Sequence, residues 1–198
     1  AKALGVTAAL SGNLGHLPLL RDSGLTVSGD FGLNVFNSRS LDYLRRKNLA
    51  AACLSFELRF PQMRDMQKVI PAEAIVYGRL PLMITENCLV QNGTGCRLSE
   101  RGAAVPQDAP CLKPNYLQDR TGARFPLLPA YGHRTELQNS APLWLADKPD
   151  WRHCGLRFAR LRFTTESPAD CAAIFRAYEN GAPAPAAFTR GLYYRGVD

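Results

Sequence analysis

The chain has 198 residues, 46% hydrophobic and 21% charged, so wholesale disorder is excluded and one or two domains with a real core are expected. The formal net charge is +7, and no block of like charges forms a polybasic tail. A mildly basic protein of this kind permits a polyanionic partner such as RNA, without requiring one.

Neither a membrane helix nor a signal peptide is predicted. No apolar run approaches the roughly 20 residues that cross a bilayer, and the opening residues lack a cleavage site after a sustained apolar core. We therefore expect a cytoplasmic protein, in which thiols stay reduced and clustered cysteines bind metal more often than they form disulfides. The six cysteines lie at positions 53, 88, 96, 111, 154 and 171.

Short apolar runs alternate with helix-like segments through the first 85 residues. Strands are expected at 6–10, 25–27, 51–56 and 74–77, and helices at about 39–47 and 61–68. Ser38 is the predicted N-cap of the first helix, and Pro61 suits the first turn of the second. Strands that alternate with helices predict βαβ units and a parallel sheet.

Polar side chains at the carboxyl ends of parallel strands are the natural builders of a functional site. The residues near such ends are Asp30, Asn34, Ser55, Glu57 and Arg79. Glu57 is the best single candidate for acid–base chemistry or substrate binding. Arg79 could bind a carboxylate or a phosphate through two hydrogen bonds. The alternative for Glu57 is an ion pair with Arg59 or Arg79.

The character of the sequence changes after Thr85. A loop-rich region with three cysteines follows, and it contains one predicted strand at 124–128. A small α+β region is expected at the C-terminal end. The predicted divisions are residues 1–85, 86–150 and 151–198.

The C-terminal region is predicted to hold one strand and one helix. The alternation of apolar and polar residues over 156–164 slips between Phe158 and Leu161, as it does at a β-bulge. Ser167 and Gly181 are the predicted cap and end of a helix over about 168–179. Three arginines of the strand could form an RNA-facing surface, and a solvated sheet face is the alternative. They are Arg157, Arg160 and Arg162.

Several stretches together resemble the collagenase-like peptidase family U32. They are residues 29–38, 54–58, 77–83, 86–88, 119–120 with 125–126, 134–140 and 189–196. Each stretch is short, but they occur in the family's order over nearly the whole chain. The resemblance implies an α/β fold: the C-terminal half of a TIM-barrel-like domain of βα repeats, whose N-terminal half lies outside this sequence.

The resemblance also implies a cofactor. Family members were named as peptidases, whereas better-understood relatives support hydroxylation of RNA bases or of a quinone precursor and carry an iron–sulfur cluster on four cysteines. The family pattern places three of these ligands at Cys88, Cys96 and Cys111, and His133 stands where the fourth is expected. Three thiolates and an imidazole could hold a [4Fe–4S] cluster, with zinc as the alternative and three metal-free thiols as the plainest interpretation.

Three functions therefore stay open. The first is iron–sulfur-dependent modification of RNA or of a small aromatic substrate. The second is proteolysis, as the family name says. The sequence has neither an H-E-x-x-H nor a G-x-S-x-G motif, but a Cys–His pair such as Cys88 with His133 could supply the nucleophile and base. The third is a part of a protein that is inactive by itself. Open sheet edges would then favour self-association into a homo-oligomer.

Overall fold

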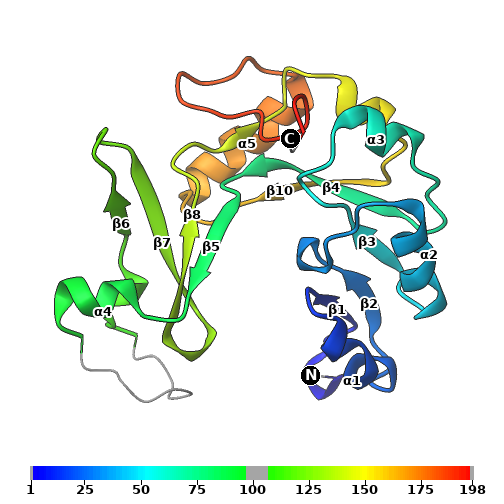
Figure 1. Cartoon of the computed structure of the whole chain (residues 1–198), viewed down its shortest axis with the longest axis horizontal. Coiled ribbons are helices and arrows are strands. Elements are labelled where there is room, and N and C mark those ends of the chain that lie inside the picture. Colours follow the sequence, from blue (N-terminus) through cyan, green and yellow to red (C-terminus); the bar gives the residue numbers. More distant parts are fainter. Residues whose placement is uncertain (1, 97–106, 197–198) are drawn as a thin grey trace.

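The computed structural model describes residues 2–96 and 107–196, and Figure 1 shows their arrangement. The strands form two sheets. One is a parallel sheet in the order β1-β2-β3-β4-β10, with β9 pairing antiparallel to β4; the other is antiparallel, in the order β5-β8-β7-β6. In Figure 1 the chain forms an arch, with β1, β2 and β3 on one side, β5 to β8 on the other, and β4, β10 and α5 across the top.

The first sheet is a series of parallel strands separated by helices, which confirms the mixed α/β prediction. Its strands are β1 (Ala8–Ser11), β2 (Thr26–Gly29), β3 (Ala51–Cys53), β4 (Ala72–Gly78), β9 (Leu143–Trp144) and β10 (Phe158–Arg162). The connecting helices are α1 (Leu17–Arg21), α2 (Ser38–Arg46) and α3 (Phe60–Asp65). Asn37, not Ser38, caps α2: its side chain accepts a hydrogen bond from Ser40 N at 2.9 Å.

The two faces of this sheet differ, because successive side chains of a strand point to opposite sides. One face carries small buried residues such as Ala52 and Ala72, which are register partners on β3 and β4. Leu41 of α2 and Met63 of α3 belong to the same buried core. The other face carries Ser28, Ala51, Cys53, Glu73 and Arg160, and it holds the polar side chains that follow.

The C-terminal segment joins the first sheet. β10 runs parallel to β4, and the register shifts between Arg160 and Leu161, which confirms the predicted β-bulge. α5 (Pro168–Asn180) is capped by Ser167 and ends at Gly181, as predicted. Further on, Tyr193 is buried and stacks on Phe60 of α3 with 5.0 Å between the ring centroids. The division at residue 151 therefore does not coincide with a boundary between the sheets.

The second sheet, of which only one strand was expected, consists of β5 (Pro81–Thr85), β6 (Asn115–Gln118), β7 (Arg124–Ala130) and β8 (Arg134–Gln138). The helix α4 (Leu89–Thr94) packs on it through Val90, in a small core with Leu127 and Leu137. β5 comes directly after β4 of the first sheet in the sequence, but it pairs with β8 of the second sheet.

Short 3-10 helices complete the fold: η1 (Lys2–Leu4), η2 (Leu14–His16), η3 (Phe31–Leu33), η4 (Pro110–Leu112), η5 (Tyr131–His133) and η6 (Asp150–His153). Within residues 2–96 and 107–196, no helix is long and apolar enough to span a bilayer.

Candidate functional site

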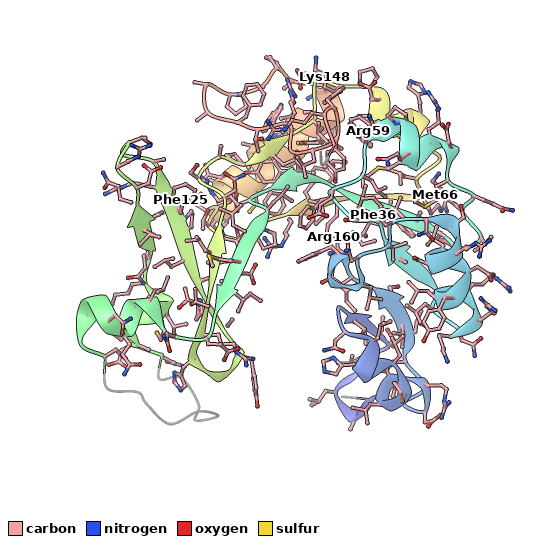
Figure 2. The ribbon with its side chains drawn as sticks, in the orientation of Figure 1. Phe36, Arg59, Met66, Phe125, Lys148 and Arg160 are labelled. Carbon is pink, nitrogen blue, oxygen red and sulfur yellow. The ribbon has the colours of Figure 1, made fainter. Side chains whose placement is uncertain are left out.

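A charged cluster lies on the open face of the first sheet, and we call it the Arg160 cluster: Asp30, Cys53, Glu73 and Arg160. Nη1 of Arg160 lies 2.5 Å from Oδ1 of Asp30, and Nη2 contacts Oε1 of Glu73. Cys53 is the register partner of Glu73. Arg160 therefore joins β10 to β4 and to the loop that follows β2, where Figure 2 also places it.

A cavity of about 580 Å³ lies over the same face. Small side chains such as Ala8, Ser28 and Ala51 line most of it, and Glu73 and Arg160 supply its charge. Because the strand pattern leaves these positions without bulky side chains, the polar groups of the cluster border open space rather than a packed interior.

Cys53 is not an activated thiol. Burial raises its pKa well above the ordinary range; Arg160 opposes the shift, while Glu73 and Asp30 add to it. A neutral, buried thiol is a poor nucleophile. The cluster is therefore a network of charges around a neutral cysteine that belongs to the buried core.

Arg79 and Glu57, the two predicted catalytic residues, are not members of the Arg160 cluster. Nη1 of Arg79 donates to the backbone oxygens of Asn139, at 2.9 Å, and of Ser140, so that the side chain holds the turn after β8. Its Nε is buried without a hydrogen-bond partner among the described residues. Glu57 is half-buried just beyond β3. The salt bridges of the described residues do not pair it with Arg59 or Arg79, and nothing else in the structure assigns it a role.

The three arginines predicted to face RNA have different surroundings. Arg157 lies immediately before β10 and is exposed. Arg160 is paired in its cluster, and Nη2 of Arg162 lies 3.0 Å from Oε1 of Glu136, while its Nη1 donates to Gln138 and to the backbone oxygen of Arg79. Two of the three positive charges are therefore balanced by carboxylates. Binding of RNA by this strand stays a prediction.

The cysteine-containing region lies at one end of the second sheet. Cys88 is the N-cap of α4, and its Sγ accepts a hydrogen bond from Gln91 N at 3.4 Å. Cys96 follows the end of α4, and Cys111 lies in η4 against the small core around Val90. Burial raises the pKa of the Cys111 thiol, and Cys88 and Cys96 raise it further. Cys88 and Cys96 are therefore both near enough to Cys111 to raise its pKa.

His133 lies at the same end of the sheet. It closes η5, immediately before β8, and the next residue, Arg134, forms a 2.9 Å ion pair with Glu86. Glu86 in turn is two residues before Cys88. The donor chemistry of this region, sulfur with one imidazole nitrogen, fits zinc or an iron–sulfur cluster. Among the residues that the structure places, however, no group of three or more His, Cys, Asp or Glu side chains is arranged to hold a metal ion. The shared site stays a prediction.

Sequence reasoning did not identify Glu73 as a site residue and did not connect Arg160 with Asp30. Their separation of 130 residues along the chain hides the contact, since the order of β10 in the sheet is not readable from spacing. The one signal in the sequence was Asp30, a polar residue directly after the half-buried strand β2.

Comparison with known proteins gives one match. A family model described as "Peptidase family U32" matches residues 1–112, which include β1 to β5, α4 and the three cysteines of the second sheet. No curated protein and no solved structure matches the chain.

Proposed function

The chain belongs to peptidase family U32, and we propose that its cysteine-containing region holds an iron–sulfur cluster that supports hydroxylation or a related modification of RNA or a small aromatic substrate. The observation that carries this proposal is the placement of the cysteines: Cys88 caps α4, and Cys111 packs against the small core to which Val90 of α4 belongs. Cys88 and Cys96 are near enough to Cys111 to raise its pKa.

In this proposal the three cysteines supply thiolate ligands and His133 supplies an imidazole nitrogen. A bound cluster would supply one-electron redox chemistry. The protein's own contribution is to hold the thiols at one end of the second sheet and to exclude water from Cys111, which is half-buried beside Val90 and Leu127. Because metal-binding thiols must lose their protons, the raised pKa of Cys111 favours loading at mildly alkaline pH.

We further propose that the first sheet is part of a βα barrel in a protein of the reducing cytoplasm. Four consecutive strands that are all parallel support the barrel, together with a polar residue, Asp30, directly after β2. The six free cysteines support a reducing compartment.

Anaerobic reconstitution tests the cluster. The purified chain is treated with iron and sulfide, desalted, and assayed for bound iron, bound sulfide and broad visible absorption. We expect Cys88→Ser, Cys96→Ser and Cys111→Ser each to lower iron retention strongly, and Cys171→Ser in α5 to leave it unchanged. Retention that is equal in Cys88→Ser and Cys171→Ser, or a wild-type chain that retains no iron, would contradict the proposal. Retention of zinc alone in a colourless protein would replace it with the zinc alternative.

Proteolysis remains the second candidate, because the family description names a peptidase and Cys88 and His133 lie at the same end of one sheet. Hydrolysis of a gelatin-derived peptide that is abolished in Cys88→Ala, and that survives removal of all metal by a chelator, would favour this candidate over the cluster.

A further inference from the structure

Two threonines bracket Cys88, one on each side along the backbone. Thr85 is the last residue of β5, and its cross-strand partner on β8 is Thr135. The hydroxyl of Thr85 donates to the backbone oxygen of Asn87 at 2.7 Å. The hydroxyl of Thr135 accepts a hydrogen bond from the backbone N–H of Leu89 at 3.1 Å. The peptide groups immediately before and after Cys88 are therefore both bound to threonine hydroxyls.

These bonds add to the hydrogen bond that the Cys88 thiol accepts from the N–H of Gln91. The N–H of Leu89 is among the first four of α4, which have no acceptor inside the helix. Thr135 supplies that acceptor and is itself only 1% exposed, so water does not compete at its hydroxyl. The Thr85 hydroxyl also lies 3.3 Å from the backbone oxygen of Thr135, which ties the pair to each other.

From this geometry we propose that Thr85 and Thr135 are positioning residues: they fix the backbone around Cys88, and with it the direction of its thiol toward Cys96 and Cys111. The inference rests on the proposed function, since a metal shared by these thiols gives the restraint its purpose. A metal ligand that is fixed before loading pays less conformational entropy on binding. Neither threonine touches a metal-binding atom in this arrangement; both act through the peptide groups that flank Cys88.

The test separates the hydroxyl from the rest of the side chain. Thr135→Val keeps the branched shape and removes the hydroxyl, whereas Thr135→Ser keeps the hydroxyl and removes a methyl group. Thr85→Val is the second variant, at a less buried position that tolerates the change if Thr135→Val does not fold. Thr164→Val is the matched control, because the buried hydroxyl of Thr164 has no hydrogen-bond partner in the described part of the chain.

The first measurement uses metal-free protein and therefore does not depend on the cluster. Each variant is treated with iodoacetamide under native conditions, and the alkylation of each cysteine is followed by peptide mass spectrometry. We expect Cys88 to react roughly fivefold faster in Thr135→Val and in Thr85→Val, the factor that corresponds to one lost hydrogen bond. Thr135→Ser and Thr164→Val should keep the wild-type rate, and the rate at Cys171 should not change in any variant.

The second measurement is the rate at which reconstituted protein loses iron to a chelator, which we expect to rise in the two valine variants and not in Thr135→Ser. The positioning role is overturned if Thr135→Val and Thr85→Val fold but keep the wild-type alkylation rate at Cys88. It is also overturned if Thr135→Ser behaves like Thr135→Val. If the wild-type chain binds no iron but the contrast between serine and valine persists at Cys88, the proposed function fails and the positioning of this thiol stands.

Discussion

The guanidinium of Arg162 lies 3.0 Å from the carboxylate of Glu136, and this pair joins β10 of the first sheet to β8 of the second. The same arginine donates to Gln138, which is completely buried, and to the backbone oxygen of Arg79 at the start of the segment that leads into β5. One side chain thus satisfies polar groups on both sides of the junction between the sheets.

Replacement of Arg162 should destabilise the protein strongly. Arg162→Met leaves the carboxylate of Glu136 and the amide of Gln138 without their cationic partner, and breaking such a partly buried network costs about 3 kcal/mol. Urea unfolding measures the change in free energy. Arg21→Met is the control, because Arg21 pairs with Asp22 in solvent, and we expect it to leave the unfolding free energy unchanged. Equal effects of the two substitutions would show that the junction does not depend on Arg162.

Gly78, at the end of β4, should not tolerate a side chain. Its φ is +127°, and a Cβ atom there would lie 2.2 Å from the backbone oxygen of Arg162, which cannot move without disrupting β10. We expect Gly78→Ala to cost at least about 3 kcal/mol of unfolding free energy. Gly93→Ala in α4 is the matched control, since no atom approaches its Cβ position within 4 Å, and it should be neutral or stabilising by up to about 1 kcal/mol. A Gly78→Ala protein as stable as Gly93→Ala would contradict the close approach of β4 and β10.

Stability should fall in acid partly because of Asp147. Two hydrogen bonds from Arg190 lower the pKa of this carboxyl below its usual value. The unfolded chain therefore takes up the proton at a higher pH than the native protein. The contribution of this carboxyl to stability is present above the ordinary Asp range, near pH 4, and is lost as the pH falls through the depressed native value.

Unfolding free energies between about pH 7 and pH 2.5 check this sign. Asp147→Asn should be less stable than wild type by about 1 kcal/mol at neutral pH, and the difference should shrink in acid. Glu179→Gln, at an exposed position of α5, serves as the control and should not change the pH dependence. A difference between Asp147→Asn and wild type that stays constant down to pH 2.5 would show that Asp147 is not linked to acid unfolding.

Cys53 should resist alkylation in the native protein. Its side chain is 1% exposed and burial raises its pKa, so both access and the thiolate fraction are low. With iodoacetamide at pH 8, peptide mapping should show Cys53 reacting at least about tenfold more slowly than the half-exposed Cys171. The difference should vanish in concentrated urea. Comparable native rates would mean that the open face of the first sheet admits reagents to β3.

Contact with RNA, if it occurs at β10, should depend on Arg157, the residue immediately before this strand. Arg157 is exposed, whereas the charges of Arg160 and Arg162 are balanced by carboxylates. We expect Arg157→Ala to weaken binding of a single-stranded RNA and to lower the slope of log affinity against log salt by about 1. Arg21→Ala is the control for net charge. An unchanged slope in Arg157→Ala would remove this strand from the RNA-binding surface.

Local signals predicted local features well. Ser167 and Gly181 identified the two ends of α5. A serine followed by proline satisfies the backbone at the start of a helix, and a glycine adopts the left-handed conformation that ends one. The slip in alternation identified the bulge beside Arg160. All four parallel strands of the first half begin within two residues of their expected starts, and β3 ends at Cys53 rather than at residue 56.

The pairing of distant strands could not be predicted from the sequence, because it depends on segments that lie far apart in the chain. β5 and β8 are about 50 residues apart. In β5 the consecutive residues Leu82, Met83 and Ile84 are all exposed, so its sequence lacks the alternation of apolar and polar residues from which a pairing could be predicted. The Arg160 cluster required knowing that β10 lies beside β4. For the cysteine region, the resemblance supplied the candidate ligands, and the sequence could not say how the sheet arranges them.

The burial of Tyr193 near the end of the chain has a practical consequence. Its ring stacks on Phe60 and its hydroxyl donates to the backbone oxygen of Ile75 at 2.6 Å, so this side chain links α3 to β4. Truncation of the chain after Arg190, a common step in preparing proteins for crystallisation, would remove Tyr193 and leave a cavity lined by Phe60 and β4.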